Sequence, residues 1–288
     1  MRNRILTGFG IAISVILIFT SVLLIYRYIN STYRYYRSQV ERLFADVESS
    51  DKELISQKDL IDLPAPVRKY LEYVGVTGTE KVRNFSVVID GEFKMSQDRA
   101  WAPVLVEQIS FTDNPVRLFY MELKFLGLKI FGLHHYESAA ASMDIKILDV
   151  FKVAQARGIE MNRSETVTIF NDMCILAPAA LIDSRISWRE IDDFTVEGTY
   201  TNAGIAVKGV LFFNEKGQLI NFVSNDRYFL NEDGTYELLS WSTPVGEYRE
   251  INGLNLPGYG EALWERNDGQ FCYAKFNIRD VTINSGLE

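Results

Sequence analysis

The sequence predicts an α+β protein in which one N-terminal transmembrane helix is followed by a large, curved, mainly antiparallel β-sheet with a few packed helices. Three observations predict this fold. The first is a run of 22 residues without a charge, from Ile5 to Tyr26. The second is the alternation of apolar and polar residues from about residue 81 onward, and the third is the set of Asp-Gly and Asn-Gly turn signals between these segments. A sheet of about ten strands must curl or close, so we expect a curved one.

The uncharged run is long enough to cross a membrane. At about 1.5 Å per residue it spans about 33 Å, against a hydrocarbon core of about 30 Å. It is longer than the apolar region of a cleaved signal peptide, about 7–15 residues, and no small-residue cleavage site follows it. Tyr26, Tyr28 and Tyr33 suit an interfacial aromatic belt. We therefore expect a retained single-pass anchor that contacts the lipid bilayer through residues 5–26.

An apolar stripe continues beyond the anchor at the spacing of one helix face, through Ile29, Tyr33, Tyr36, Val40, Leu43 and Val47. The sequence favours packing of this stripe on the protein's own domain. A short coiled-coil stalk that joins two chains as a homodimer is the alternative. The predicted organisation is an anchor and helical stalk over residues 1–47, a linker and short helix over 48–79, and a β-rich domain over 80–288 with a helical insertion near 161–183.

Charge is distributed unevenly along the chain. Residues 1–47 hold six Arg and two acidic residues, which leaves 24 basic and 36 acidic residues in the remainder. An acidic domain repels phosphate, so we expect no nucleic-acid partner. Counting Lys and Arg around the anchor slightly favours a cytoplasmic C-terminus. A short basic N-terminus before an apolar run is, however, the usual export arrangement, and we expect an extracytoplasmic domain.

The helical segments have recognisable ends. A helix is predicted to begin at Pro64 or Pro66 and to stop at Gly75. A second helix is predicted with Asn162 or Ser164 as its cap and Glu165 in its first turn. Proline 178 is expected to end that helix or to open a short one. Strands are predicted at 85–89, 104–111, 116–125, 129–136, 186–191, 195–201, 205–213, 219–229, 236–241, 245–251, 260–265 and 271–281.

Few residues suggest chemistry. His134 and His135 are the only histidines, and neighbouring strand residues point to opposite faces, so they cannot share a metal. We expect no metal site and no cofactor, because no nucleotide-binding or nucleophile motif is present. Carboxylate pairs such as Glu190 and Asp192 suit a solvated face better than a glycosidase site. Cys174 and Cys272 are expected to be buried thiols, with one long-range disulfide as the alternative.

The segment Leu118–Leu133 is apolar with little alternation, so both faces of this strand pair are expected to be covered. Burial beneath a helix is the favoured reading, and a lipid or other apolar ligand held in the curved sheet is the alternative. The candidate ligand-binding residues are Phe119, Met121, Leu123, Phe125, Phe131 and Trp188.

Three motifs carry a resemblance to a known family. They are Leu-Pro-Ala-Pro-Val-Arg-Lys-Tyr-Leu over 63–71, Pro-Ala-Ala-Leu-Ile over 178–182 and Ile-Ser-Trp-Arg-Glu-Ile-Asp over 186–192. With Tyr248, Asn252-Gly253 and Pro257 they make the chain resemble an uncharacterised bacterial membrane-anchored family, a domain of unknown function. The hairpin pattern is also similar to the half-barrel fold of bacterial lipoprotein carriers. The chain departs from the family at 138–142, where alanines replace an expected glycine.

The resemblance implies a half-barrel-like sheet and no particular activity, because fold does not dictate function. The sequence favours a membrane-tethered module of unknown molecular function that binds an apolar ligand, and it favours a non-enzymatic role. A cell-envelope hydrolase that uses carboxylates is one alternative, and a structural or assembly protein that acts through the stalk is another.

Overall fold

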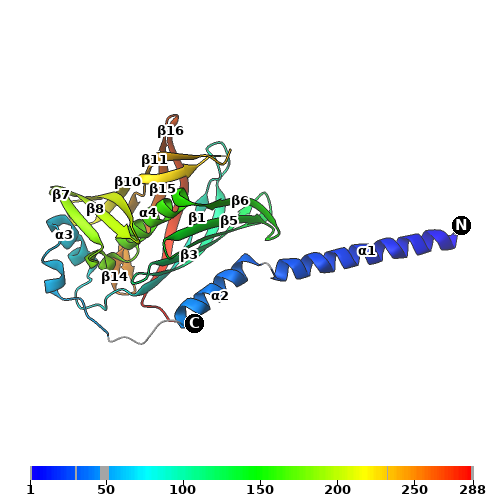
Figure 1. Ribbon diagram of the computed structural model, residues 1–288, viewed down its shortest axis with the longest axis horizontal. Helices are drawn as coiled ribbons and strands as arrows, with labels where there is room; N and C mark the ends of the chain where they lie inside the picture. Colours follow the sequence, from blue (N-terminus) through cyan, green and yellow to red (C-terminus); the bar gives the residue numbers. More distant parts are fainter. Residues whose placement is uncertain (1, 30, 46–51, 232, 287–288) are drawn as a thin grey trace.

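The computed structural model describes residues 2–29, 31–45, 52–231 and 233–286, with side-chain environments from residue 13 onward. Helix α1 (Arg2–Ile29) extends away from a domain built on one large sheet, as predicted (Figure 1). Every pairing between its strands is antiparallel. The α+β class and the curved antiparallel sheet are therefore confirmed.

The strands run in the order β6-β5-β4-β3-β2-β1-β16-β15-β11-β10-β9-β8-β7, with β12 added to β15 and with β13 and β14 in a separate hairpin. Their bounds are β1 Asn84–Phe93, β2 Ala102–Phe111, β3 Val116–Phe125, β4 Leu128–Glu137, β5 Ala140–Ile147, β6 Phe151–Arg157, β7 Ile186–Asp192, β8 Thr195–Asn202, β9 Ile205–Phe213, β10 Leu219–Leu230, β11 Tyr236–Ser242, β12 Val245–Gly246, β13 Arg249–Ile251, β14 Leu254–Leu256, β15 Tyr259–Arg266 and β16 Gly269–Ile283.

Helix α4 (Ile159–Ile175) lies on the concave side of the sheet. It contacts β5 and β6 at one edge and β9 and β10 near the other, which requires the sheet to curl around it (Figure 1). Its Val167 and Phe170 have no exposed surface. Phe170 fits against the sheet because Gly198, on β8, has no side chain: a Cβ there would lie 2.6 Å from the Phe170 ring. The predicted helical insertion thus forms the centre of the core.

The start of α4 differs from the prediction. Gly158 is the residue before the first turn, so Asn162 and Ser164 lie inside the helix rather than at its cap. Both polar side chains are used for tertiary hydrogen bonds instead: Asn162 accepts from the Ala141 backbone at 2.7 Å, and Ser164 accepts from the Tyr228 backbone at 2.9 Å. These bonds tie α4 to β5 and β10.

Helix α2 (Thr32–Ala45) packs on the convex side, opposite α4. Tyr36, Val40 and Leu43 are buried against β3 and β4. These three residues of the stripe therefore pack on the protein's own domain, which is the favoured interpretation. Ile29 is 71% exposed and Tyr33 is 38% exposed, and Val47 lies outside the described residues. Pairing of two chains through the stalk would require these side chains to leave the sheet.

Helix α3 (Ala65–Val74) covers the end of the sheet farthest from α1 (Figure 1). Pro64 precedes its first residue, and Gly75 caps its C-terminus with a left-handed φ of 88°, as predicted. The short 3-10 helices η1 (Gln57–Leu60) and η2 (Pro178–Ile182) complete this end. The Tyr70 hydroxyl donates to the Cys174 carbonyl at 2.8 Å and so joins α3 to the end of α4.

The sequence pattern does not predict two of the strands, and one predicted strand is divided in the structure. The strands β5 and β6 were not predicted; β6 is an edge strand whose side chains are mostly exposed, so it shows little alternation. The predicted strand over 245–251 is interrupted at Glu247, which has a φ of 54°. The segment 138–142, where alanines replace the expected glycine, begins with a hairpin turn in which Ser138 and Ala139 both adopt positive φ.

Candidate functional site

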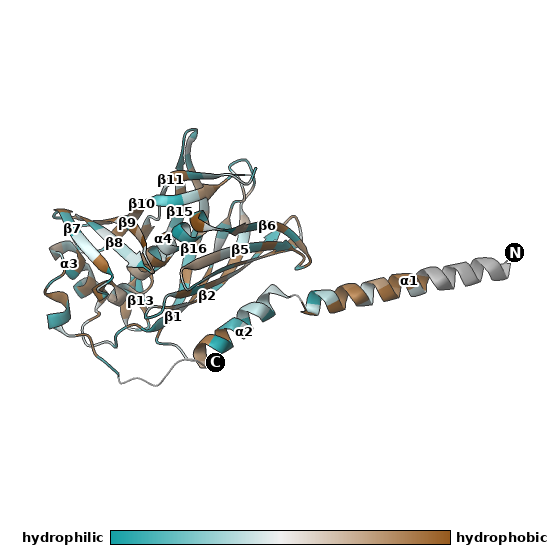
Figure 2. Ribbon diagram, viewed as in Figure 1, coloured by the Kyte–Doolittle hydropathy of each residue, from teal (hydrophilic) through white to brown (hydrophobic). Residues whose placement is uncertain are grey.

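The N-terminal helix has the composition of a membrane span. By length and hydropathy α1 is a candidate membrane-crossing helix, and from residue 13 onward none of its apolar window is buried by the protein. Figure 2 shows mostly apolar residues along the coloured part of α1, with a hydrophilic turn at its C-terminal end. Ile16, Ile18 and Phe19 are each more than 60% exposed. A helix that is apolar all round suits a lipid environment.

The six candidate ligand-binding residues do not form one group. The register of β3 places Phe119, Met121, Leu123 and Phe125 on the concave face, because their neighbours in the core are those of the α4 side. Phe131 lies on the convex face beneath α2. Trp188 is on β7, near the far edge of the sheet, and packs against Phe170 of α4 at 6.2 Å between ring centroids.

Two sets of contacts therefore explain the apolar segment 118–133. The convex-face side chains Leu118, Tyr120, Phe131 and Leu133 are buried beneath α2, so the predicted burial beneath a helix is confirmed for that face. The concave-face side chains have a different environment. Met121 and Leu123 are buried, whereas Phe119 and Phe125 are only half-buried.

The concave face has a covered part and an open part. Along β3, Arg117 bonds to α4 and is buried, whereas Phe119 and Phe125 on the same face are half-buried. In this open part, apolar side chains from six strands are half-buried. We call them the open concave face: Phe93, Phe119, Phe125, Met143, Ile145, Ile147, Phe229, Leu239 and Tyr273.

A buried cluster of charges marks the border between the two parts. The Arg117 guanidinium donates to Asp172 at 2.7 Å and to Glu165 at 3.2 Å, and both carboxylates are on α4. Gln108, on β2, donates to the same Asp172 oxygen at 2.7 Å. The three charged side chains are at most 10% exposed. Because each buried charge has an opposite charge or a hydrogen-bond partner, the cluster can persist away from water.

Aromatic rings of the concave side pack against the arginines of this region. The Arg117 guanidinium lies 4.6 Å from the centroid of Phe119. Arg227, on β10, lies 4.3 Å from the Trp241 ring and 5.0 Å from the Trp264 ring. The Trp241 indole donates to the Tyr273 hydroxyl at 3.1 Å. The face is therefore apolar in its open part and cationic where it meets α4.

The two histidines point to opposite faces, as predicted. His134 faces inward and its Nδ1 lies 3.0 Å from Glu165. His135 faces outward and its Nε2 lies 3.1 Å from Glu137, which also accepts from Arg42 of α2. Among the described residues, no three His, Cys, Asp or Glu side chains are arranged to hold a metal ion.

Electrostatics keeps Glu165 ionised. Burial raises its pKa, but His134, Arg117 and Arg227 outweigh that effect, and the pKa falls from 4.5 to about 2. Burial raises the pKa of Asp172, against the opposing influence of Arg117 and Gln108. Glu165 is thus a fixed anion rather than a proton donor at neutral pH.

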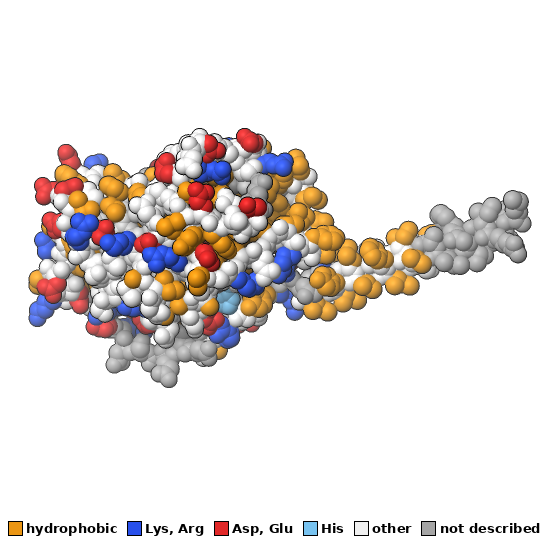
Figure 3. All heavy atoms as spheres, turned by 45° about the horizontal axis from the view of Figure 1, so that its top comes forward, with side chains coloured by type: hydrophobic (Ala, Val, Ile, Leu, Met, Phe, Trp, Pro, Cys, Tyr) orange, Lys and Arg blue, Asp and Glu red, His pale blue; other side chains and the backbone are white. Residues whose placement is uncertain are grey.

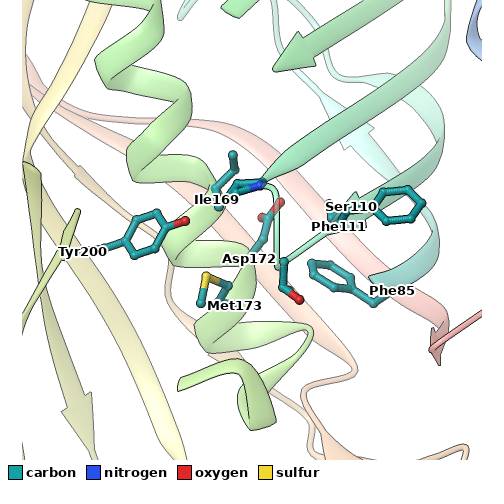
Figure 4. Close-up of a pocket in the computed structure, with 9 residues that line it drawn as sticks. Phe85, Ser110, Phe111, Ile169, Asp172, Met173 and Tyr200 are labelled. Atoms are coloured by element: carbon teal, nitrogen blue, oxygen red, sulfur yellow. The ribbon is translucent and has the colours of Figure 1, made fainter. Parts of the chain in front are cut away.

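The cavity beside Asp172 is small. It has a volume of about 10 Å³ and is lined by Asp172, Ser110, Tyr200 and apolar side chains (Figure 4). The buried Tyr200 hydroxyl has no hydrogen-bond partner among the described residues. This volume fits one water molecule, which Tyr200 and Asp172 could bind, but not a substrate.

Little in the sequence pattern indicates this cluster. The sequence pattern predicts Glu165 only as a helix-start residue and assigns no role to Arg227. The available signal was Arg117, a charge within the apolar strand β3, which needs a buried partner.

The two cysteines do not pair: Cys174 is buried and Cys272 is half-buried, both as free thiols.

Comparisons with known proteins place the chain in a family. A model described as "Family of unknown function (DUF6544)" matches residues 53–276. No curated protein matches the chain.

Several solved structures are similar at low identity. They include an outer membrane lipoprotein-sorting protein domain from Vibrio parahaemolyticus (11% identity, TM-score 0.41, 71% of this chain and 87% of that chain). Another is a LolA superfamily protein from Nitrosomonas europaea (12%, 0.39, 77% and 93%). A third is a DUF1329 family protein from Desulfovibrio piger (9%, 0.42, 78% and 94%). The family model covers most of the chain, and the protein therefore belongs to the DUF6544 family, a family of unknown function.

Proposed function

We propose that the protein is a membrane-tethered binding module, held outside the cytoplasm by α1, whose open concave face takes up an apolar group such as a lipid acyl chain. The observation that supports this most is the set of half-buried apolar side chains on the open concave face. A contiguous apolar surface on a folded domain indicates a binding surface, because water contact with it is unfavourable.

The helix α4 supports the same proposal by its position. It fills one part of the curved sheet and is fixed there by Asp172 and Glu165, so that part has no room for a ligand. The other part keeps its aromatic side chains half-buried. An acyl chain along β3 would contact Phe119 and Phe125, with Met121 and Leu123 beneath it. Phe131 takes no part, because it is beneath α2.

The hydrolase alternative has less support. His134, Glu165 and Asp172 do lie close together. However, His134 bonds to Glu165, and both carboxylates bond to Arg117, so these side chains are not directed at an open cleft. The adjoining cavity of about 10 Å³ admits a water and no larger molecule. A binding role therefore fits these contacts better than a catalytic one.

Photo-crosslinking of the full chain in detergent micelles tests the proposal. The probe is a palmitate analogue that carries a diazirine, and the labelled peptides are identified by mass spectrometry. We expect labels on the concave side of β3 and β5, within residues 119–125 and 143–147. Labels confined to α1 would contradict the proposal.

Two substitutions on the same strand give a matched control. Phe93→Asp places a charge on the open concave face, and Val88→Asp places one on the convex face, where Val88 is 47% exposed. We expect Phe93→Asp to remove most of the β3 labelling and Val88→Asp to leave it unchanged. Equal labelling of both folded variants would contradict the proposed face, and the melting temperature of each shows that it is folded.

A further inference from the structure

Two hairpin turns at one end of the sheet carry exposed leucines. Leu126, between β3 and β4, is 85% exposed, and Leu148, between β5 and β6, is 38% exposed. Both adopt a left-handed backbone, with φ of 49° and 54°. The two turns are adjacent in space, because Leu148 donates a backbone hydrogen bond to Lys129 at 2.8 Å.

A leucine is an unusual residue for such a turn. A left-handed conformation costs an L-residue about 1–2 kcal/mol, and Gly, Asn or Asp normally occupy it. The hairpin at the other end of β4 has small residues at these positions, Ser138 and Ala139, at φ of 53° and 60°. Exposed leucines at one end, with small residues at the other, indicate that the leucine end meets an apolar environment.

Further apolar side chains enlarge this end. Leu128 is 45% exposed, Phe151 is 60% exposed and Val153 is 53% exposed. We call these three residues and the two turn leucines the apolar tip. Figure 3 shows hydrophobic side chains gathered where the domain meets the N-terminal helix.

The apolar tip lies beside the end of α1. Asp149, next to Leu148, bonds to Thr32 at the start of α2, only three residues after α1 ends. A groove of about 570 Å³ is lined both by Leu24 and Tyr28 of α1 and by Leu105 and Lys129 of the sheet. The helix that suits a bilayer and the apolar tip are therefore neighbours.

Two lysines lie next to the apolar tip, where a membrane interface would place them, and each pairs with a carboxylate: Lys129 with Glu122 at 2.5 Å and Lys152 with Asp144 at 2.7 Å. Lys129 and Lys152 are on the same hairpins as the exposed leucines, and their side chains are 53% and 45% exposed. Lysine can bury its stem against acyl chains and keep its ammonium group at the headgroups. This end of the sheet thus has exposed apolar side chains with lysines beside them, which is the arrangement of a membrane-contacting surface.

We propose that the apolar tip inserts into the same bilayer that holds α1, so that the protein contacts lipid at two places. The inference rests on the membrane tether of the proposed function and deepens it. The open concave face ends at this tip, since Phe125 and Ile147 directly precede Leu126 and Leu148. An acyl chain could therefore pass from the bilayer to the open concave face without crossing water.

Depth-dependent quenching in membranes tests the inference. The full chain with Cys272→Ser is reconstituted into vesicles of phosphatidylethanolamine and phosphatidylglycerol; Cys174 is fully buried and stays in place. An environment-sensitive fluorophore is attached at Leu126→Cys or Leu148→Cys. Ser138→Cys, in the equivalent turn at the opposite end, is the matched control. Ile16→Cys, read with lipids that carry nitroxides near the ends of their acyl chains, reports on α1, because residue 16 is at the middle of the span.

The inference predicts blue-shifted emission at residues 126 and 148 and loss of most of that emission when the lipids carry nitroxides near the headgroup. The probe at 138 should keep a water-like spectrum and full emission. Water-like, unquenched probes at 126 and 148 together with a quenched probe at 16 would contradict insertion of the apolar tip and would still support the tether. A blue shift without quenching would indicate a second protein chain and would also overturn the inference. An unquenched probe at 16 would instead contradict the tether.

Discussion

The Asp149 carboxylate, in the turn between β5 and β6, accepts hydrogen bonds from the Thr32 backbone at 3.0 and 3.1 Å, at the first residue of α2. A turn of the sheet thus caps the helix from a distance in sequence, beside Ser31, whose hydroxyl accepts from the Arg34 backbone at 3.5 Å. The negative charge also suits the positive end of the helix dipole. This contact fixes the connection between α1 and the sheet.

Asp149→Ala should release the start of α2. Loss of a buried cap costs about 1–2 kcal/mol, and here it also removes the contact of Thr32 with the sheet. We expect faster amide hydrogen exchange in residues 32–36 of the full chain, measured by mass spectrometry. Exchange in α3, which does not contact Asp149, serves as the internal control. Unchanged exchange at 32–36 would show that the cap does not hold α2.

Arg117→Met should be among the most destabilising single changes. It leaves Asp172 buried without its cation and removes one of the cations beside Glu165, and removal of one partner of a buried pair costs about 3–5 kcal/mol. Arg189→Met removes an exposed partner of Glu197 and should cost at most about 1 kcal/mol. Urea unfolding of both variants compares the two losses. Equal midpoints would contradict a structural role for the buried cluster.

The low pKa of Glu165 predicts acid sensitivity. A folded pKa of about 2 against an ordinary 4.5 stabilises the folded state fully above pH 4.5, and this stabilisation is lost as the pH falls towards 2. The loss is on the order of 3 kcal/mol. The raised pKa of Asp172 acts in the opposite direction, because its protonation favours folding as the pH falls.

Glu165→Gln isolates the contribution of Glu165. The variant should be less stable than the wild type at pH 7, and the difference should shrink between pH 4.5 and pH 2. Thermal unfolding at a series of pH values measures it. A difference that stays constant through this window would contradict the lowered pKa.

Two fully buried tyrosines should respond differently to loss of the hydroxyl. The Tyr136 hydroxyl accepts from Asn202 at 2.7 Å and lies 3.1 Å from the Thr166 hydroxyl, whereas the described residues offer the Tyr200 hydroxyl no partner. Tyr136→Phe should cost about 1–3 kcal/mol, and Tyr200→Phe should change stability little. Melting temperatures of the two variants give the comparison. A larger loss for Tyr200→Phe would show that its hydroxyl has a strong bond to water or a ligand.

The parts of the fold that local patterns determine were predictable. Alternation located most strands, Gly75 marked the end of α3, and Pro178 marked the break between α4 and η2. The opposite orientations of His134 and His135 followed from strand geometry alone. These features depend on residues close in sequence, so one sequence suffices to find them.

The features that depend on distant contacts were not predictable. The start of α4 was misplaced because Asn162 and Ser164, which look like caps, bond to β5 and β10 instead. The edge strand β6 shows no alternation because few of its side chains are buried. The pairing of Arg117 with Glu165 and Asp172 joins residues about 50 positions apart, a distance over which no local pattern acts. The division of the candidate ligand residues between two faces likewise needed the position of α2.

Membrane fractionation followed by intact-mass measurement tests most directly whether α1 holds the domain at the bilayer. Cells that express the full chain are lysed, and the membranes are washed with salt and then with alkaline carbonate. The tether predicts a chain that still contains residues 5–26, stays in the pellet after both washes and is released by detergent. Recovery of a polypeptide that starts near residue 27 or later, in the detergent-free supernatant, would contradict it.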